Sequence, residues 1–238
     1  AANGGYSYYS NYGSCIFVAA PSSGSSSLAI ATTDRTGADG YNSGSDAIGD
    51  ADYTSGFGGT SAASPLVAGV LALARQANPA MNLRMAKHLL VKTAAPIDTV
   101  RTSWKVNAAG NAFSTDYGFG LIDAAALVAE APKYTGVSEQ GVEQTGTVTV
   151  NEAITGAGGN QRSFTLSHGG RLEDMEVHVS MSHAWRGDLQ AWLTSPSGST
   201  TRLWTANLAD SFDTIDWTFV TNAFWGEDPN GTWTLQVD

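Results

Sequence analysis

Residues 58–69 read Gly-Gly-Thr-Ser-Ala-Ala-Ser-Pro-Leu-Val-Ala-Gly, and this stretch decides the fold. Two glycines and a threonine lead to Ser61, and a long segment of small apolar residues follows. Residues 63–74 are apolar on nearly every side, which predicts a helix buried through a core rather than laid on a surface. Pro65 lies in the first turn of that predicted helix, where its missing N–H costs nothing.

The position of Ser61 allows two interpretations. At the positive end of a buried helix dipole, beside free backbone N–H groups, it suits a nucleophile whose attack creates an oxyanion. It also suits a helix N-cap, because serine is among the preferred capping residues. The short string Gly-Thr-Ser by itself favours the cap, so the longer stretch around it has to decide.

The composition excludes several classes of protein. A chain of 238 residues is long enough for one large domain or two ordinary ones, with a sizeable core. The net charge of −10 and the lack of a Lys/Arg-rich run argue against a nucleic-acid partner. No apolar stretch approaches the length needed to cross a bilayer, and the opening AANGG is not a signal peptide.

The first part of the chain mixes short β-prone runs with helical periodicity. The runs at 15–20 and 28–33 favour strands. Residues 34–59 are rich in Gly, Ser and Asp and predict a long loop, of a length that is usually functional. Asn82 is expected to cap a second helix, and the alanine-rich residues 121–131 predict a third.

Beyond residue 131 the composition changes, and helical patterns vanish. Residues 132–140 are typical of a linker, which divides the chain into expected domains at 1–131 and 141–238. Residues 175–181 alternate apolar and polar side chains, the period of a half-buried strand. Further short runs, separated by Gly, Pro, Asn and Asp, predict an antiparallel sandwich; they lie at 189–193, 202–205, 215–220 and 232–237.

Two kinds of residue leave alternatives open. Cys15, the only cysteine, is either a small buried core residue or half of a disulfide whose partner lies outside this chain. The tryptophans of the second part form either a core or a platform on which a carbohydrate stacks, and the core is the commoner arrangement. They are Trp185, Trp192, Trp204, Trp217, Trp225 and Trp233.

Several stretches together resemble one family. GTSAASPLVAG closely resembles the nucleophile segment of subtilisin-like serine proteases. Four other segments appear in the same order as in the kexin and proprotein convertase branch of these proteases; they are 9–24, 32–44, 76–79 and 116–128. In the second part, HAWRGDLQAWLTSPSGSTTRL (183–203) and GTWTLQV (231–237) resemble the P domain that follows the catalytic domain in convertases.

The resemblance implies a fold and an activity. The expected fold is part of an α/β subtilisin-like domain, a parallel sheet with a buried central helix, followed by an antiparallel β-sandwich P domain of jelly-roll type. The expected activity is that of a serine endopeptidase: Ser61 attacks a peptide carbonyl, its N–H donates to the oxyanion, and Thr60 supports that donor. A histidine takes the proton of Ser61, and an aspartate orients the histidine.

The resemblance also implies that the chain is a fragment. Subtilisin-like enzymes place the triad in the order Asp, His, Ser, whereas all four histidines here follow Ser61. We therefore expect the triad partners upstream of Ala1 and no peptidase activity from this chain alone. The P domain of the family continues through at least one more strand after Asp238, so an unpaired sheet edge is expected here.

Calcium is the cofactor that the resemblance implies. Four loop aspartates are the candidate ligands, although turn aspartates without a metal are the commoner case; they are Asp46, Asp50, Asp52 and Asp188. In eukaryotic convertases a glutamate of a calcium site follows the Tyr-Ser matched here by residues 9–10, and this chain has Asn11 there. That departure puts cleavage after basic residues in doubt.

The expected partners are protein or peptide substrates, with a propeptide or a chaperone as a further partner, and the chain is expected to be monomeric. By resemblance the protease is secreted, to the extracellular space or the periplasm. The competing hypothesis is non-catalytic: a pseudoprotease, or a β-sandwich that serves as a binding or stabilising module. The intact serine at position 61 favours the enzyme, because an inactive relative has no chemical need for it.

Overall fold

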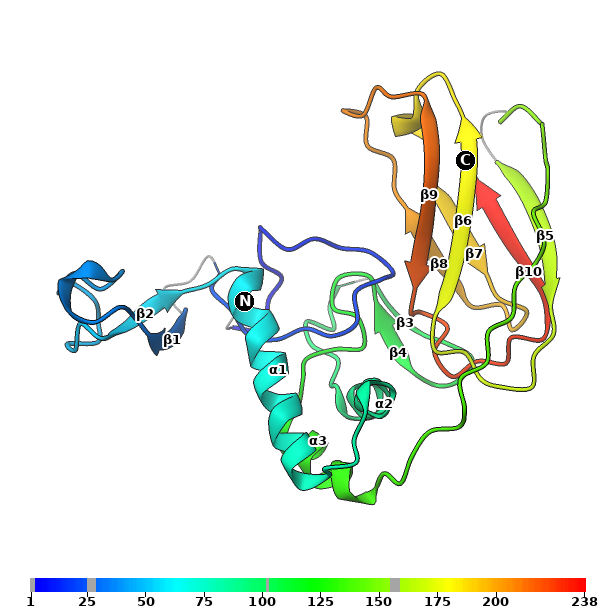
Figure 1. The fold of residues 1–238 in the computed structure, drawn as a ribbon. Coiled ribbons are helices and arrows are strands. Elements are labelled where there is room, and N and C mark those ends of the chain that lie inside the picture. Colours follow the sequence, from blue (N-terminus) through cyan, green and yellow to red (C-terminus); the bar gives the residue numbers. More distant parts are fainter. Residues whose placement is uncertain (1–2, 25–28, 102, 155–158) are drawn as a thin grey trace. The chain divides into compact units, whose positions relative to one another are not determined.

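The computed structural model describes residues 3–24, 29–101, 103–154 and 159–238 (Figure 1). In it the chain divides into two compact units. The helical unit comprises Ala1–Tyr12, Phe17–Ser103 and Phe119–Val137, and the sandwich unit comprises Gly13–Ile16, Trp104–Gly118 and Ser138–Asp238. Within the described residues, no helix is long and apolar enough to span a membrane.

The described residues of the helical unit form three α-helices, two short 3₁₀ turns and one strand pair. In chain order the elements are β1 (Ile30–Thr33), η1 (Gly37–Asp39), β2 (Tyr53–Phe57), α1 (Thr60–Ala77), α2 (Leu83–Thr93), α3 (Ala124–Glu130) and η2 (Ala131–Lys133).

The two later helices begin where the sequence predicts a cap or close to it. The side chain of Asn82 accepts a hydrogen bond from Met85 N at 2.9 Å, so the predicted cap of α2 is confirmed. Asp123 caps α3 in the same way, from Ala126 N at 2.9 Å, and α3 is shorter than the predicted 121–131. Both helices pack on the second half of α1 through a core that includes Ala74, Leu89 and Leu127.

The strands of the helical unit differ from the expectation. β1 and β2 pair antiparallel, and β2 lies inside the predicted loop 34–59. Leu28, the start of the run predicted to form the first of these strands, lies outside the described residues. Of the expected parallel sheet, the described residues contain one parallel bridge, between Ala19 and Leu121. The run at 15–20 therefore contributes this bridge rather than a strand.

Helix α1 is not buried as predicted. It begins at Thr60, and of its residues only Ala62 and Ala74 are fully buried, while Leu73 is 52% exposed. A helix that is apolar on all sides needs neighbours on all sides, and in the helical unit α1 has them on the side of α2 and α3.

The early start of α1 also changes the role of its proline. Pro65 is the sixth residue of the helix rather than part of its first turn. Its missing N–H leaves the carbonyl of Ser61 without its i+4 partner.

In the sandwich unit, the residues that the structure describes form two main antiparallel sheets and a small hairpin (Figure 1). The sheets have the orders β5-β10-β7-β8 and β6-β9, and the hairpin is β3-β4. The bounds are β3 (Trp104–Val106), β4 (Ala112–Ser114), β5 (Asn160–Leu166), β6 (Met175–Ser182), η3 (Arg186–Asp188), β7 (Ala191–Thr194), β8 (Thr200–Trp204), β9 (Thr214–Thr221) and β10 (Gly231–Val237).

The core between the two main sheets confirms the predicted sandwich. Val177 and Val179 of β6 face inward, as the alternating pattern predicts, and share one hydrophobic cluster with Leu193 of β7 and Trp233 of β10. Trp233 is completely buried, and its indole Nε1 donates to Pro229 O at 2.9 Å. Strand β5 was not predicted from the sequence.

The loop between β3 and β4 is tied into the sandwich by Asn107. Its amide Nδ2 donates to Ala223 O and to Trp225 O, both at 3.0 Å, and its Oδ1 accepts from the backbone of Ala109 and Asn111. This side chain is 8% exposed, so its full hydrogen-bonding capacity is used in a dry environment.

Residues 13–16 join the sandwich unit in a similar way. Asn222 N donates to Ser14 O at 2.9 Å, and Asn222 Nδ2 donates to Cys15 O at 3.0 Å. Two segments from the first half of the sequence are therefore structural parts of the sandwich unit.

The variant Asn107→Ala should destabilise the sandwich unit by about 2–4 kcal/mol. It leaves the carbonyl of Ala223 without its donor and the amides of Ala109 and Asn111 without their acceptor, and it removes one of the two donors to Trp225 O. The free energy of unfolding in urea, followed by tryptophan fluorescence, measures the loss. Asn11→Ala is the matched control, since Asn11 is exposed and its side chain makes no hydrogen bond within the described residues. Equal midpoints for the two variants would contradict the role given to Asn107.

Candidate functional site

Ser61 lies just behind a sharp turn from strand to helix. β2 ends at Phe57, two glycines follow, and α1 begins at Thr60 with Ser61 as its second residue. Gly59 has a φ of 77°, in the left-handed region that favours glycine. A Cβ on Gly58 would overlap the side chain of Ser23. Position 58 therefore requires glycine for space, and position 59 requires it for backbone conformation.

Ser61 is not the N-cap of α1. The N-cap is Gly59, and no side chain caps the helix. Ser61 is exposed, and its hydroxyl makes no hydrogen bond within the described part of the chain. The N-cap interpretation of Ser61 is therefore wrong. What the geometry offers is a free hydroxyl at the positive end of an 18-residue helix, next to backbone N–H groups that no side chain occupies.

Two adjacent serines hold the turn from outside. The hydroxyl of Ser22 donates to Gly59 O at 2.6 Å, and Gly59 N donates to Ser23 Oγ at 3.1 Å. We call this pair, Ser22 and Ser23, the Gly59 clamp. The carbonyl of Ser23 in turn accepts hydrogen bonds from Ser7 Oγ at 3.1 Å and from the hydroxyl of Tyr9. The clamp was not predicted from the sequence, because two serines between a proline and a glycine are typical of any turn and do not indicate a distant partner.

Tyr9 belongs to the same network, and its ionisation reflects it. Burial by itself raises the pKa of the Tyr9 phenol, but hydrogen bonds with Ser22, Ser23, Ser7 and the backbone of Gly59 outweigh burial. The net result is a pKa below the usual value for tyrosine.

The structure brings no histidine to Ser61 among the residues it describes. His88, on α2, stacks on Tyr134 with ring centroids 6.2 Å apart, so it is half-buried rather than a solvated surface residue. His178 is exposed on β6 and contacts Asp216 and Thr218 across the strand pair. His168 and His183 bond within their own turns.

Asp46, a candidate calcium ligand, is occupied as a hydrogen-bond acceptor. Its carboxylate accepts from Ile48 N at 3.0 Å, from Thr54 Oγ1 at 3.0 Å, and from both the hydroxyl and the amide of Ser55. The Ser55 hydroxyl and these further donors hold the pKa of Asp46 far below its usual range. The carboxylate thus organises the loop that leads into β2.

Other acidic and amide side chains of this loop also make hydrogen bonds to its own backbone. Asp50 Oδ1 accepts from Asp52 N at 3.0 Å, and Asp52 Oδ1 accepts from Gly37 N at 2.8 Å. Asn42, which is fully buried, donates to the carbonyls of Ile48, Asp50 and Tyr53. These contacts close the loop as a series of Asx turns.

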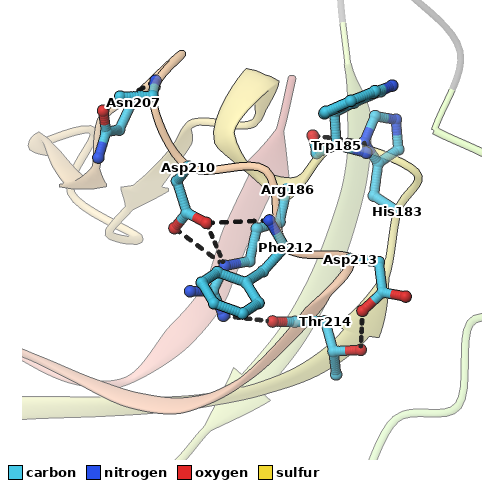
Figure 2. Close-up of polar contacts among 9 residues, drawn as sticks. His183, Trp185, Arg186, Asn207, Asp210, Phe212, Asp213 and Thr214 are labelled. Carbon is cyan, nitrogen blue, oxygen red and sulfur yellow. Dashed lines mark hydrogen bonds and ion pairs between the residues drawn. The ribbon is translucent and has the colours of Figure 1, made fainter.

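Asp188 is the last residue of the short 3₁₀ turn η3, which begins at Arg186. Figure 2 shows the polar contacts of Arg186. Arg186 donates from Nε to both carboxylate oxygens of Asp210, at 3.0 and 3.1 Å, and from a terminal nitrogen to Thr214 O at 2.6 Å. Its guanidinium also lies 4.9 Å from the ring of Phe212. Asp188 itself is exposed, and its carboxylate has no partner within the described ranges.

The candidate aspartates do not fit a calcium site. Over the described ranges, no group of three or more His, Cys, Asp or Glu side chains is placed to hold a metal ion. Calcium ligation normally needs six or more oxygen atoms around one point. The oxygens of Asp46 are already saturated by donors, and Asp188 stands alone.

The structure bears on the alternatives that the sequence leaves open for Cys15 and for the tryptophans. Cys15 is exposed and unpaired within this chain, so its interpretation as a buried core residue is wrong. Trp225 and Trp233 are buried, as the core interpretation of the tryptophans predicts, whereas Trp185 is 57% exposed and Trp217 is 64% exposed. The tryptophans therefore do not form a single stacking platform.

Comparison with protein families gives two matches that cover different parts of the chain. Residues 1–120 match the Subtilase family, and residues 172–238 match the proprotein convertase P-domain. The first match contains Ser61 and the Gly59 clamp.

Individual relatives agree with these matches. Proprotein convertase subtilisin/kexin type 6 of Homo sapiens is 40% identical over 197 residues, which cover 77% of this chain and 20% of that protein. Furin of Homo sapiens is 35% identical over 194 residues, which cover 76% and 24%. The chain thus spans about a fifth to a quarter of these relatives.

Solved structures extend the likeness to nearly the whole chain. The serine protease of Aeromonas sobria matches 97% of this chain with a TM-score of 0.85 and 28% identity, and 48% of that protein is covered. A second structure, of this protease with a chaperone, matches with a TM-score of 0.84 and 26% identity.

The role of Asp46 predicts a pH dependence. Because its folded pKa is depressed, its contribution to stability is complete above the ordinary carboxyl value of 3.8 and is lost as the pH falls through the folded value. Hydrogen-exchange protection of the Ser55 amide should therefore be higher in the wild type than in Asp46→Asn at neutral pH, and the two should converge in acid. Asp39→Asn is the control, since Asp39 is exposed and its carboxylate makes no hydrogen bond to another described residue. A difference that persists unchanged in acid would refute this role.

Proposed function

Since the chain belongs to the Subtilase family and carries a proprotein convertase P-domain, we propose that it is part of a serine endopeptidase of the kexin and furin type. One observation carries the proposal: Ser61 presents a free, exposed hydroxyl at the positive end of α1, within the part of the chain that matches the family. A serine in this position has no capping role to explain it.

In the proposed mechanism, Oγ of Ser61 attacks the carbonyl carbon of a peptide bond. A general base takes the hydroxyl proton and returns it to the leaving amine, and water then hydrolyses the acyl-enzyme. The N–H of Ser61 donates to the developing oxyanion, and Thr60, the first residue of α1, supports that donor. The helix dipole adds to the same stabilisation.

We further propose that this chain is a fragment that is inactive alone. The proposal is supported by its coverage of 48% of the solved protease and by the absence, among the residues described, of a hydrogen bond between Ser61 and a histidine. The triad Asp and His would come from the preceding sequence, in the order that the family uses. The same sequence would complete the parallel sheet and cover the exposed side of α1, and the sandwich would be of jelly-roll type.

The partners follow from the same proposal. The substrates are proteins or peptides, and a propeptide or chaperone is a further partner, because one solved relative was crystallised with a chaperone. The chain is proposed to be monomeric and secreted, to the extracellular space or the periplasm. Calcium remains part of the proposal for the complete protease only, with ligands other than the four loop aspartates. Asn11 argues against a strict preference for basic residues.

Labelling with a fluorophosphonate probe tests the function. Three proteins are compared: this chain, the chain extended upstream to its natural start, and the extended chain with Ser61→Ala. We expect labelling of the extended wild type alone, with a loss of at least about 1,000-fold on substitution. Ser64→Ala in the extended protein is the control, since Ser64 is an exposed serine of the same helix.

The opposite result has a definite meaning. If the extended wild type folds but is not labelled, the chain is no serine protease. The non-catalytic hypothesis, a pseudoprotease or a binding or stabilising sandwich, then takes its place.

A further inference from the structure

We propose that Ser22 and Ser23, the Gly59 clamp, are positioning residues for the nucleophile. They hold the backbone of Gly59 in one conformation and thereby fix the first turn of α1, from which Ser61 Oγ and its N–H act. The inference rests on the proposed function, because it concerns the same serine. It adds residues that touch neither substrate nor the reacting atoms.

The first argument is the geometry of the clamp. Both polar backbone groups of Gly59 are held: its C=O by the Ser22 hydroxyl at 2.6 Å, and its N–H by Ser23 Oγ at 3.1 Å. The same carbonyl also accepts from Ala62 N at 3.1 Å, within the first turn of α1. A displacement of Gly59 would therefore break bonds on both sides of the residue.

The second argument is that Gly59 needs such support. Glycine populates left-handed and right-handed conformations about equally, so a φ of 77° at this position is not enforced by the residue itself. No side chain caps α1, which removes the usual means of fixing a helix start. The main core contacts of α1 lie near its other end, around Ala74.

The third argument is that the clamp is itself anchored. Ser22 is buried, and Ser23 lies against Gly58 so closely that a Cβ there would overlap its side chain. The carbonyl of Ser23 accepts from the hydroxyls of Ser7 and Tyr9. A chain of hydrogen bonds thus leads from residues 7–9, through the clamp, to the turn that precedes Ser61. Misplacing a reacting group by about 1 Å can cost about 100-fold in rate.

The experiment uses the protein extended upstream to its natural start. Ser22→Ala and Ser23→Ala are prepared singly and together, with Ser64→Ala as the matched control. Two quantities are measured: the rate of fluorophosphonate labelling and its final amplitude, which counts correctly folded sites. Values of kcat and KM on a peptide substrate accompany them.

We expect each clamp variant to label and turn over about 10- to 100-fold more slowly than the wild type, at full amplitude and with KM changed less than kcat. The double variant should be less impaired than the product of the single effects, because both hydroxyls act on one residue. Tyr9→Phe, which keeps both clamp hydroxyls and removes the phenol hydroxyl that contacts Ser23 through its carbonyl and its Oγ, should show a smaller effect of the same kind. If a clamp variant fails to fold, the labelling rate of Tyr9→Phe tests the inference in its place.

Other outcomes overturn the inference. Wild-type rates in the clamp variants and in Tyr9→Phe would show that the clamp does not position Ser61. A reduced amplitude with an unchanged rate for the labelled fraction would show that the clamp serves folding alone. If the extended wild type itself is not labelled, the proposed function fails, and this inference falls with it.

Discussion

Gly59 turns the chain from β2 into α1 with a φ of 77°, a conformation that a residue with a Cβ adopts only under strain. The direction of α1, the exposure of Ser61 and the free N–H groups at the helix start all depend on this one residue. Glycine permits the turn but does not enforce it, so the hydroxyls of Ser22 and Ser23 supply the missing constraint. The residue that allows the turn and the residues that fix its conformation therefore come from different segments of the sequence.

Those features of the fold that depend on local chemistry could be predicted from the sequence. The cap at Asn82 follows from its own side chain, and the inward face of β6 follows from a period of two. The hypothesis that Ser61 is the nucleophile rests on the long, specific string that its neighbours form. Each of these signals lies within a few residues of the feature that it predicts.

Features that depend on contacts between distant segments could not be predicted. The clamp joins residues 22–23 to Gly59, and nothing in the sequence relates them. The apolar character of α1 indicated burial, but burial requires neighbours on every side, and the described residues of the helical unit leave Leu73 of this helix 52% exposed. The hydrogen bonds of Asp46 could not be foreseen either, because a loop carboxylate can bind calcium or accept from backbone amides, and the choice depends on the conformation of the loop.

The hydrogen bonds of Asn107 and Asn222 have a consequence for how such proteins can be divided. These bonds attach two segments, 13–16 and 104–118, to the strands of the sandwich unit. Both segments precede the predicted linker in the sequence, yet they belong to the sandwich unit in space. A cut at the linker would therefore not release a self-sufficient module, since buried carbonyls would lose their donors. If this sandwich is exchanged for that of a relative, the β3-β4 hairpin should be exchanged with it. The segment to be exchanged is therefore larger than residues 172–238, which match the P-domain family.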